Sequence, residues 1–170
     1  MNHEKPKPLY TPEQRSRRDQ SIWTTIQGVL APLQFVVFLI SVVLVVRFLA
    51  TGDGALAAHV SIVVKTLLLY AIMITGSIWE KVVFGRFLFA EPFFWEDVFS
   101  MLVLVLHTAY LVGLGFGLGD TYTLMWLALA AYAAYVINAG QFLLKLRTAR
   151  LERVALTDGA PDPNFAEAMR

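Results

Sequence analysis

The sequence FVVFLISVVLVV at residues 35–46 contains one hydroxyl group and no charged side chain. It lies inside an apolar stretch from Ile22 to Ala50, and three comparable stretches follow at Val60–Phe84, Phe94–Leu118 and Thr121–Leu146. Each is longer than the roughly 20 residues that cross a bilayer as a helix. Because a helix satisfies its own backbone hydrogen bonds in lipid, the pattern predicts an all-α integral membrane protein, a bundle of four transmembrane helices.

The composition agrees with a membrane protein and excludes several other classes. The 170 residues are 57% hydrophobic and 16% charged, with a formal net charge of +1. Because the basic residues form no continuous patch, we expect no nucleic-acid partner. The sequence has no cysteine, which excludes disulfides, thiolate zinc sites, iron–sulfur clusters and covalently attached haem.

Charged residues divide the chain into a polar N-terminal segment (residues 1–20), a transmembrane domain (21–150) and a flexible tail (151–170). Basic residues concentrate on one side of the predicted helices, and only Arg47 and Lys65 belong to the other side. The positive-inside rule then places both termini and the connection between the second and third helices in the cytoplasm. The basic residues of that side are Lys5, Lys7, Arg15, Arg17, Arg18, Lys81, Arg86, Lys145, Arg147, Arg150, Arg153 and Arg170.

Two local features modify this simple picture. Pro32 interrupts the first apolar stretch and predicts a kink, with residues 22–31 lying partly in the interface. The connection at residues 84–95 is rich in aromatic residues and is interrupted by Gly, Arg, Glu and Pro, so we expect it at the cytoplasmic interface. Its aromatic side chains can either anchor in that interface or stack on a flat ligand; they are Phe87, Phe89, Phe93, Phe94 and Trp95.

Polar residues recur at spacings of three and four in every predicted helix, which places them on one face. In the third helix the stripe contains Glu96, Ser100, Val103, His107 and Tyr110. We expect each polar face to point into the bundle. The other helices contribute Gln27 and Gln34, Lys65 and Glu80, and Asn138, Gln141 and Lys145.

Three acidic residues, Glu80, Glu96 and Asp97, stand at ends of apolar stretches that face the same side. A charged group costs about 2.5–3.5 kcal/mol at mid-membrane and less near the headgroups. Burial and a nearby negative charge favour the protonated carboxyl group, which makes Glu80 or Glu96 a candidate acid. A structural ion pair is the competing explanation for Glu80, with Lys81, Arg86 or Arg18 as its partner.

The remaining polar residues also admit structural explanations. Uncharged polar side chains commonly link membrane helices through hydrogen bonds worth about 1 kcal/mol or less, and Lys65 and Lys81 can extend toward the headgroups. His107, near mid-membrane, is either a hydrogen-bonded packing residue or a ligand or base. Because neither His3 nor His59 can complete a metal site with His107, we expect no metal site belonging to the protein itself.

Several long strings of the sequence resemble the 3-vinyl bacteriochlorophyllide hydratase family, also called chlorophyllide a 3¹-hydratase. They are WEKVVFG (79–85), FFWEDVFSM (93–101), LHTAY (106–110), YTPEQR (10–15), QGVLAPLQF (27–35) and YAAYVINA (132–139). The resemblance spans about Tyr10 to Leu151, and the departures lie in the tails and the short outer loops. It implies a bacterial inner-membrane enzyme that adds water to the C3 vinyl group of a magnesium chlorin, giving a 1-hydroxyethyl group.

This reaction needs an acid that protonates the terminal vinyl carbon and a base that activates water. We predict Glu80 or Glu96 as the proton donor and Asp97 as the base or cation stabiliser, with the site toward the cytoplasm. No cofactor is expected beyond the magnesium of the substrate, for which His107 is a candidate axial ligand. The substrate-binding candidates are His107, Asn138, Gln141, Gln27, Gln34, Trp95, Phe94 and Tyr110.

Two functions from other classes stay open at this point. A non-catalytic chlorin-binding or pigment-assembly protein would also use four helices, a histidine and aromatic residues. A small proton-coupled transporter would use membrane carboxylates, although the chain shows no inverted halves. The expected partners are the tetrapyrrole and the lipid bilayer, and further candidates are neighbouring enzymes of the pathway and a second copy of the chain.

Overall fold

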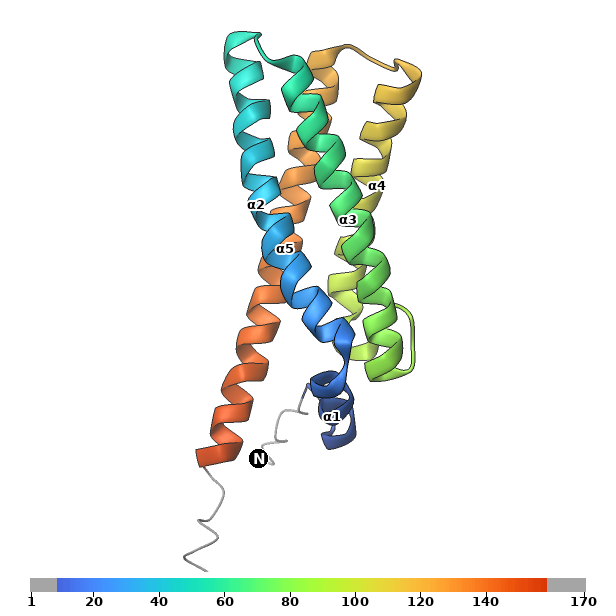
Figure 1. The fold of residues 1–170 in the computed structure, drawn as a ribbon, viewed down its shortest axis with the longest axis vertical. Helices are drawn as coiled ribbons and strands as arrows, with labels where there is room; N and C mark the ends of the chain where they lie inside the picture. Colours follow the sequence, from blue (N-terminus) through green and yellow to red (C-terminus); the bar gives the residue numbers. More distant parts are fainter. Residues whose placement is uncertain (1–8, 159–170) are drawn as a thin grey trace, which may run out of the picture.

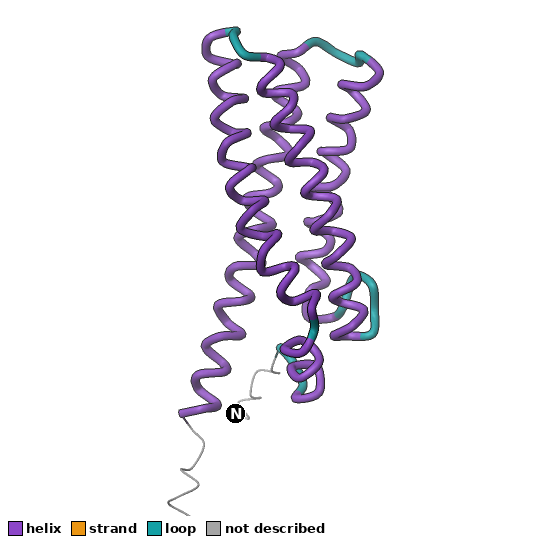
Figure 2. Tube along the Cα trace, in the orientation of Figure 1, coloured by secondary structure: helices purple, strands orange, loops and turns teal. Residues whose placement is uncertain are grey.

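The computed structural model describes residues 9–158, and every regular element within them is helical (Figures 1 and 2). Helices α2 to α5 run up and down as a four-helix bundle, with α1 folded beneath one end (Figure 1). Within these residues four helical stretches are long and apolar enough to cross a membrane, in agreement with the four helices predicted from the sequence. The elements are α1 (Pro12–Gln20), α2 (Ile22–Thr51), α3 (Ala55–Phe84), the short 3₁₀ helix η1 (Glu91–Phe93), α4 (Phe94–Phe116) and α5 (Thr121–Asp158).

The helix bounds follow the apolar stretches of the sequence, and two bounds differ by more than two residues. Helix α3 begins at Ala55 instead of Val60. Helix α5 continues beyond the predicted end at Leu146 to Asp158, so residues 151–158, the first part of the predicted tail, are helical. The rest of that predicted tail, residues 159–170, lies outside the described residues, as do residues 1–8.

The polar N-terminal segment contains a helix that the sequence prediction left out. Helix α1 begins with a capping box, in which Thr11 Oγ1 accepts from the Gln14 N–H at 3.2 Å and Gln14 Oε1 accepts from the Thr11 N–H at 2.9 Å. Pro12 occupies the first helical position, where its missing N–H and fixed φ are favourable. The signal for this helix was therefore present in the sequence.

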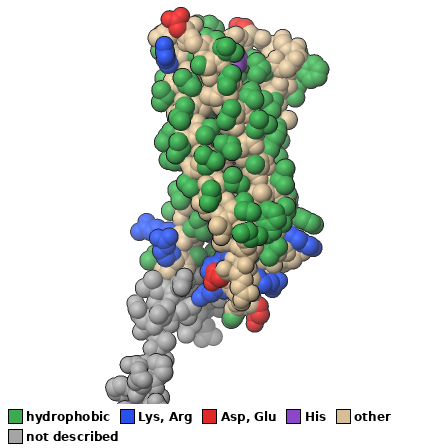
Figure 3. Space-filling view, in the orientation of Figure 1, with side chains coloured by type: hydrophobic (Ala, Val, Ile, Leu, Met, Phe, Trp, Pro, Cys, Tyr) green, Lys and Arg blue, Asp and Glu red, His purple; other side chains and the backbone are tan. Residues whose placement is uncertain are grey.

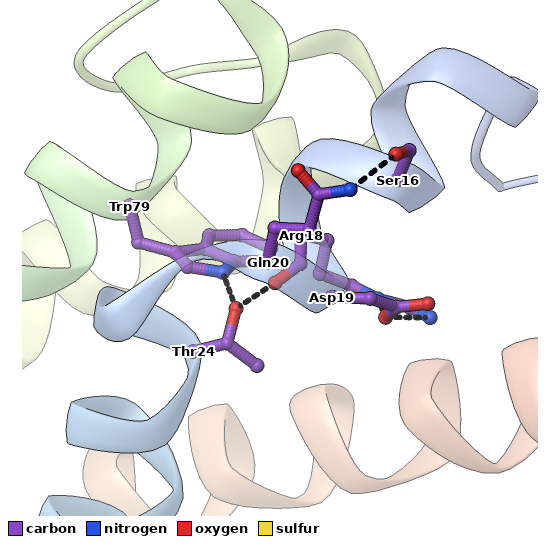
Figure 4. Close-up of polar contacts among 6 residues, drawn as sticks. All are labelled: Ser16, Arg18, Asp19, Gln20, Thr24 and Trp79. Carbon is purple, nitrogen blue, oxygen red and sulfur yellow. Dashed lines mark hydrogen bonds and ion pairs between the residues drawn. The ribbon is translucent and has the colours of Figure 1, made fainter.

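Hydrogen bonds and ring contacts fix α1 against the ends of α2 and α3. Trp79 Nε1 donates to Thr24 Oγ1 at 2.9 Å, and Thr24 Oγ1 donates to the Arg18 carbonyl at 2.6 Å (Figure 4). The Tyr10 ring stacks on Phe84 with 5.7 Å between centroids, and the Arg18 guanidinium lies 4.7 Å from the Tyr10 centroid. Burial raises the pKa of Tyr10, and the Arg18 charge opposes that shift.

The outside of the bundle is apolar. Val43 is 65% exposed and Val105 is 62% exposed, whereas Val45 and Val103 on the same helices are fully buried. Hydrophobic side chains cover the middle of the molecule in Figure 3, and Lys and Arg side chains gather mainly at its lower end. Because exposed apolar surface of this extent is unfavourable in water, the belt fits the hydrocarbon region of a bilayer.

The interior carries the polar stripes, as predicted. On α4 the stripe from Glu96 to Tyr110 is buried along its whole length. Helix α2 packs mainly against α3, and α4 packs mainly against α5. Helix α2 is unbroken through Pro32, so the predicted interfacial segment 22–31 belongs to the same continuous helix, which changes direction in its lower half (Figure 1).

Candidate active site

Two carboxyl groups meet where α3 ends and α4 begins. Glu80 lies in the last turns of α3, and Asp97 lies in the first turn of α4. The two residues are 5% and 3% exposed, and their carboxyl groups lie within hydrogen-bonding reach of each other. The sequence placed both carboxyl groups at the same end of the bundle, and the structure brings them into direct contact.

The connection between α3 and α4 supplies one backbone donor to each carboxyl group. The Phe89 N–H donates to Asp97 Oδ2 at 2.6 Å, and the Ala90 N–H donates to Glu80 Oε2 at 3.2 Å. Phe89 adopts a φ of 58°, a left-handed conformation that is uncommon for a bulky residue and costs of order 1–3 kcal/mol. The residue whose N–H binds Asp97 therefore has an unfavourable backbone conformation.

The contact between Glu80 and Asp97 requires a shared proton. An ionised carboxylate only accepts hydrogen bonds, and two carboxylates in contact repel each other strongly in a buried site. The dipole of α3 presents its negative end near Glu80, and the dipole of α4 presents its positive end near Asp97. This arrangement favours the proton on Glu80 and the negative charge on Asp97.

Glu96, the neighbour of Asp97, has a different partner. Lys145 Nζ of α5 donates to Glu96 Oε2 at 2.8 Å, and the Glu96 side chain is 8% exposed. Lys145 also donates to the Pro92 carbonyl and lies 5.1 Å from the centroid of the Phe93 ring. Lys145 therefore connects α5 to both η1 and α4 beside the carboxyl pair.

Asn138 and Gln141 extend this polar surface on α5. Asn138 Nδ2 donates to Ser100 Oγ at 2.9 Å, and Ser100 stands one turn beyond Glu96 on α4. Asn138 Oδ1 and Gln141 Oε1 are buried and have no hydrogen-bond partner among the described residues. Because an unsatisfied buried acceptor costs about 1–3 kcal/mol, these oxygens are positions where a water molecule or a polar ligand atom would bind.

Three of the other predicted binding residues form no hydrogen bond with the pair within residues 9–158. Gln27 Nε2 donates to Thr75 Oγ1 at 2.7 Å and so links α2 to α3. Tyr110 forms a 2.6 Å hydrogen bond with His59 Nδ1 toward the opposite end of the bundle. Gln34 is buried on α2, and its Nε2 has no partner within residues 9–158.

His107 is distant from the pair, because it follows Asp97 on α4 by a rise of about 15 Å. It is fully buried, its Nδ1 bonds the Val103 carbonyl at 2.8 Å, and its Nε2 has no partner in the described part of the chain. Among those residues no group of His, Asp and Glu could hold a metal ion.

Lys65 does not extend toward the headgroups, contrary to the sequence-based expectation. It is fully buried, and its Nζ lies 4.0 Å from the centroid of the Tyr135 ring and 5.6 Å from that of Tyr132. Aromatic faces attract an ammonium group, and they hold this side chain inside the bundle.

The aromatic residues of the α3–α4 connection separate into two groups. Phe93 is 2% exposed and packs in the core against Trp79, with 5.7 Å between ring centroids. Phe89, Phe94 and Trp95 are 36%, 45% and 66% exposed. Their rings form a row, with 5.7 Å from Phe89 to Phe94 and 5.6 Å from Phe94 to Trp95. This aromatic row begins beside the carboxyl pair, because the Phe89 N–H binds Asp97.

Sequence reasoning missed two parts of the site. The N–H groups of Phe89 and Ala90 are backbone donors, which cannot be identified from residue types. Lys145 was placed on the polar stripe of its helix, but its partner was not identified. A signal for that ion pair existed, since a buried acidic residue and a basic residue on inward-facing stripes at the same depth tend to pair.

Comparison with known proteins gives consistent results. The family model described as 2-vinyl bacteriochlorophyllide hydratase matches residues 10–148, a name that differs from the one above in the number given to the vinyl position. A 2-vinyl bacteriochlorophyllide hydratase of Rhodobacter capsulatus is 65% identical over 146 residues, covering 86% of this chain and 85% of the relative. A 2-vinyl bacteriochlorophyllide hydratase of Cereibacter sphaeroides is 64% identical over 147 residues, covering 86% of this chain and 91% of the relative. No solved structure matches the chain.

Proposed function

The chain belongs to the 2-vinyl bacteriochlorophyllide hydratase family, and we propose that its Glu80–Asp97 pair carries out the hydration of the vinyl group. The reaction converts the vinyl substituent of chlorophyllide a or a 3-vinyl bacteriochlorophyllide into a 1-hydroxyethyl group during bacteriochlorophyll synthesis. The observation that carries the assignment to the pair is the direct contact of two buried carboxyl groups, which need one proton between them.

In the proposed mechanism Glu80 gives its proton to the terminal vinyl carbon. The positive charge that results on the carbon next to the ring is delocalised over the macrocycle and is stabilised by the Asp97 carboxylate. Water attacks that carbon, and Asp97 accepts the proton that the water loses. Transfer of this proton from Asp97 to Glu80 through their hydrogen bond restores the starting state, so the net change is the addition of one water molecule.

Among the predicted proton donors we choose Glu80 over Glu96. The Lys145 ammonium binds the Glu96 carboxylate at 2.8 Å, which suits a role in positioning. We propose that Asn138 Oδ1 and Gln141 Oε1, the buried acceptors without partners, orient the attacking water or a polar group of the substrate.

The aromatic row suits a flat macrocycle that arrives from the lipid. Phe89, Phe94 and Trp95 are exposed and adjacent to Asp97, so a chlorin stacked on them would bring its edge to the carboxyl pair. The separation of about 15 Å between Asp97 and His107 exceeds the distance from the centre of a chlorin to its vinyl group. We therefore propose that His107 does not ligate the substrate magnesium while the pair acts on the vinyl group.

We propose further that the carboxyl pair faces the cytoplasm. Lys81 lies in the last turn of α3 beside Glu80, and Lys145 binds Glu96 next to Asp97. Lys and Arg side chains gather at this end of the molecule (Figure 3). The positive-inside rule assigns such an end to the cytoplasmic side of the inner membrane.

A product assay tests the proposal. Purified protein in lipid nanodiscs is incubated with the 3-vinyl magnesium chlorin, and the hydrated product is measured by chromatography. Glu80→Gln and Asp97→Asn should each lower turnover by about 10²–10⁴-fold, because each removes an acid–base group. Asp53→Asn, in the exposed loop at the other end of the bundle, serves as the matched control and should keep the wild-type rate. Near-normal turnover in both Glu80→Gln and Asp97→Asn, with the helical content unchanged, would refute the mechanism.

A further inference from the structure

A pocket of about 410 Å³ is lined in part by the loop that donates to the carboxyl pair. Ala90 belongs to both places, because its N–H donates to Glu80 at 3.2 Å while the residue also lines the pocket. The pocket and the pair are therefore neighbours that share Ala90. The volume lies within the range of about 300–1,000 Å³ that is typical of small-molecule sites.

Arg86 is the basic residue of this pocket, and Glu91 also lines it. Within residues 9–158 the Arg86 guanidinium forms no hydrogen bond or ion pair. The neighbouring cation Lys81, in contrast, donates to the Gly85 carbonyl at 2.9 Å. Thr11 and Gln14, which contribute polar groups from α1, are engaged with each other in the capping box. Their side chains act there only as acceptors, so the Thr11 hydroxyl and Gln14 Nε2 are neutral donors of the pocket, and Arg86 supplies its charged donors.

The substrate class of the proposed function carries such an anion. A chlorophyllide is a free acid, with a propionate side chain where a chlorophyll carries a long-chain ester. The propionate stands on the ring next to the one that bears the vinyl group, so the two groups belong to the same half of the macrocycle. An amphiphile of this kind keeps its apolar ring in the lipid and its carboxylate toward the headgroups, where Arg86 lies.

We propose that Arg86 binds the propionate carboxylate of the substrate and so makes the enzyme select the free acid over its esters. This inference depends on the proposed function for the identity of the ligand. The planar guanidinium matches a carboxylate with two parallel N–H···O bonds. The vinyl group then lies near the Glu80–Asp97 pair, which neighbours the pocket through Ala90, with the ring resting against the aromatic row.

Binding titrations test the proposal without relying on turnover. Wild-type protein, Arg86→Gln and Arg147→Gln are placed in zwitterionic nanodiscs and titrated with the 3-vinyl chlorin as the free acid and as its methyl ester, followed by pigment fluorescence. Arg147, an exposed basic residue of α5 that does not line the pocket, is the matched control. We expect wild type to bind the free acid about tenfold more tightly than the ester. This factor corresponds to the lower end of the free-energy range for charge-assisted hydrogen bonds, because the Arg86 site is open to solvent.

Arg86→Gln should remove this preference by weakening binding of the free acid about tenfold while leaving the ester unaffected, and Arg147→Gln should behave as wild type. Equal weakening of both pigments, or none, would overturn the proposal. So would an effect of Arg86→Gln that appears only with anionic lipid and is the same for acid and ester, since Arg86 would then bind lipid headgroups. Failure of the proposed function would look different, because neither pigment would be hydrated although the binding preference could still be measured.

Discussion

Replacing Lys145 with methionine should destabilise the protein and disturb the loop that holds the carboxyl pair. The substitution removes an ammonium group that contacts Glu96 at 2.8 Å, donates to the Pro92 carbonyl and lies 5.1 Å from the Phe93 centroid. Methionine keeps a similar length and an apolar stem. The lost interactions are therefore those of the charge and its hydrogen bonds.

The magnitude follows from how deeply the pair is buried. Removing one partner of a fully buried ion pair costs about 3–5 kcal/mol, because the remaining charge has no compensation. The Glu96 side chain is 8% exposed but that of Lys145 is 25% exposed, so water can partly replace the ammonium. We expect the free energy of unfolding to fall by about 1–3 kcal/mol in Lys145→Met. The double variant Lys145→Met/Glu96→Gln should lose less than the sum of the two single variants, by about 0.5–3 kcal/mol.

The assay is denaturant unfolding in detergent micelles, followed by circular dichroism, together with the hydration rate of each variant. Lys81→Met, which removes an exposed ammonium at the same end of the bundle, should change stability by less than about 0.5 kcal/mol. Strict additivity of the two single substitutions, or a Lys145→Met variant as stable as wild type, would refute the assignment of Lys145 and Glu96 as a coupled pair.

Two further tests concern the Phe89 backbone and Lys65. The first distinguishes the effect of the Phe89 N–H from that of its ring, and the second asks whether Lys65 in the bundle centre influences the carboxyl pair. Phe89→Pro and Phe89→Gly both remove the ring, but proline also removes the N–H that donates to Asp97 at 2.6 Å and excludes the φ of 58°. The proline variant should therefore catalyse hydration at least about tenfold more slowly than the glycine variant. Equal rates in the two variants would contradict the role of this N–H. Lys65→Met should be neutral or stabilising by about 1–4 kcal/mol, because it removes a buried ammonium without a hydrogen-bond partner among the described residues. Its hydration rate should equal that of wild type, and a large loss would show that Lys65 influences the site.

The fold was predictable because the bilayer restricts what a chain of this composition can do. Apolar stretches of sufficient length must become helices, and the predicted and observed bounds of α2 agree to within a residue. Helical periodicity also identified the inward faces correctly, including the stripe on α4. Lys65 belonged to such a stripe, and the expectation that it would reach the headgroups failed because its helix turns it toward Tyr135 in the interior.

The site was predictable only in its residue types. Adjacent helical residues diverge by about 100°, so Glu96 and Asp97 face different partners, Lys145 and Glu80. Which partner each would take depended on how the α3–α4 connection folds. That connection turns through Phe89 in a left-handed conformation, which the sequence does not signal because phenylalanine rarely adopts it.

The proton shared by Glu80 and Asp97 is the feature on which the mechanism depends, and infrared difference spectroscopy of the protein in lipid vesicles at neutral pH observes it directly. The proposed arrangement predicts a carbonyl band from one protonated carboxyl group that Glu80→Gln removes and Asp97→Asn shifts, with the band unchanged in Asp53→Asn. A spectrum in which all these carboxyl groups are ionised at neutral pH, or in which the band survives unaltered in both Glu80→Gln and Asp97→Asn, would contradict it.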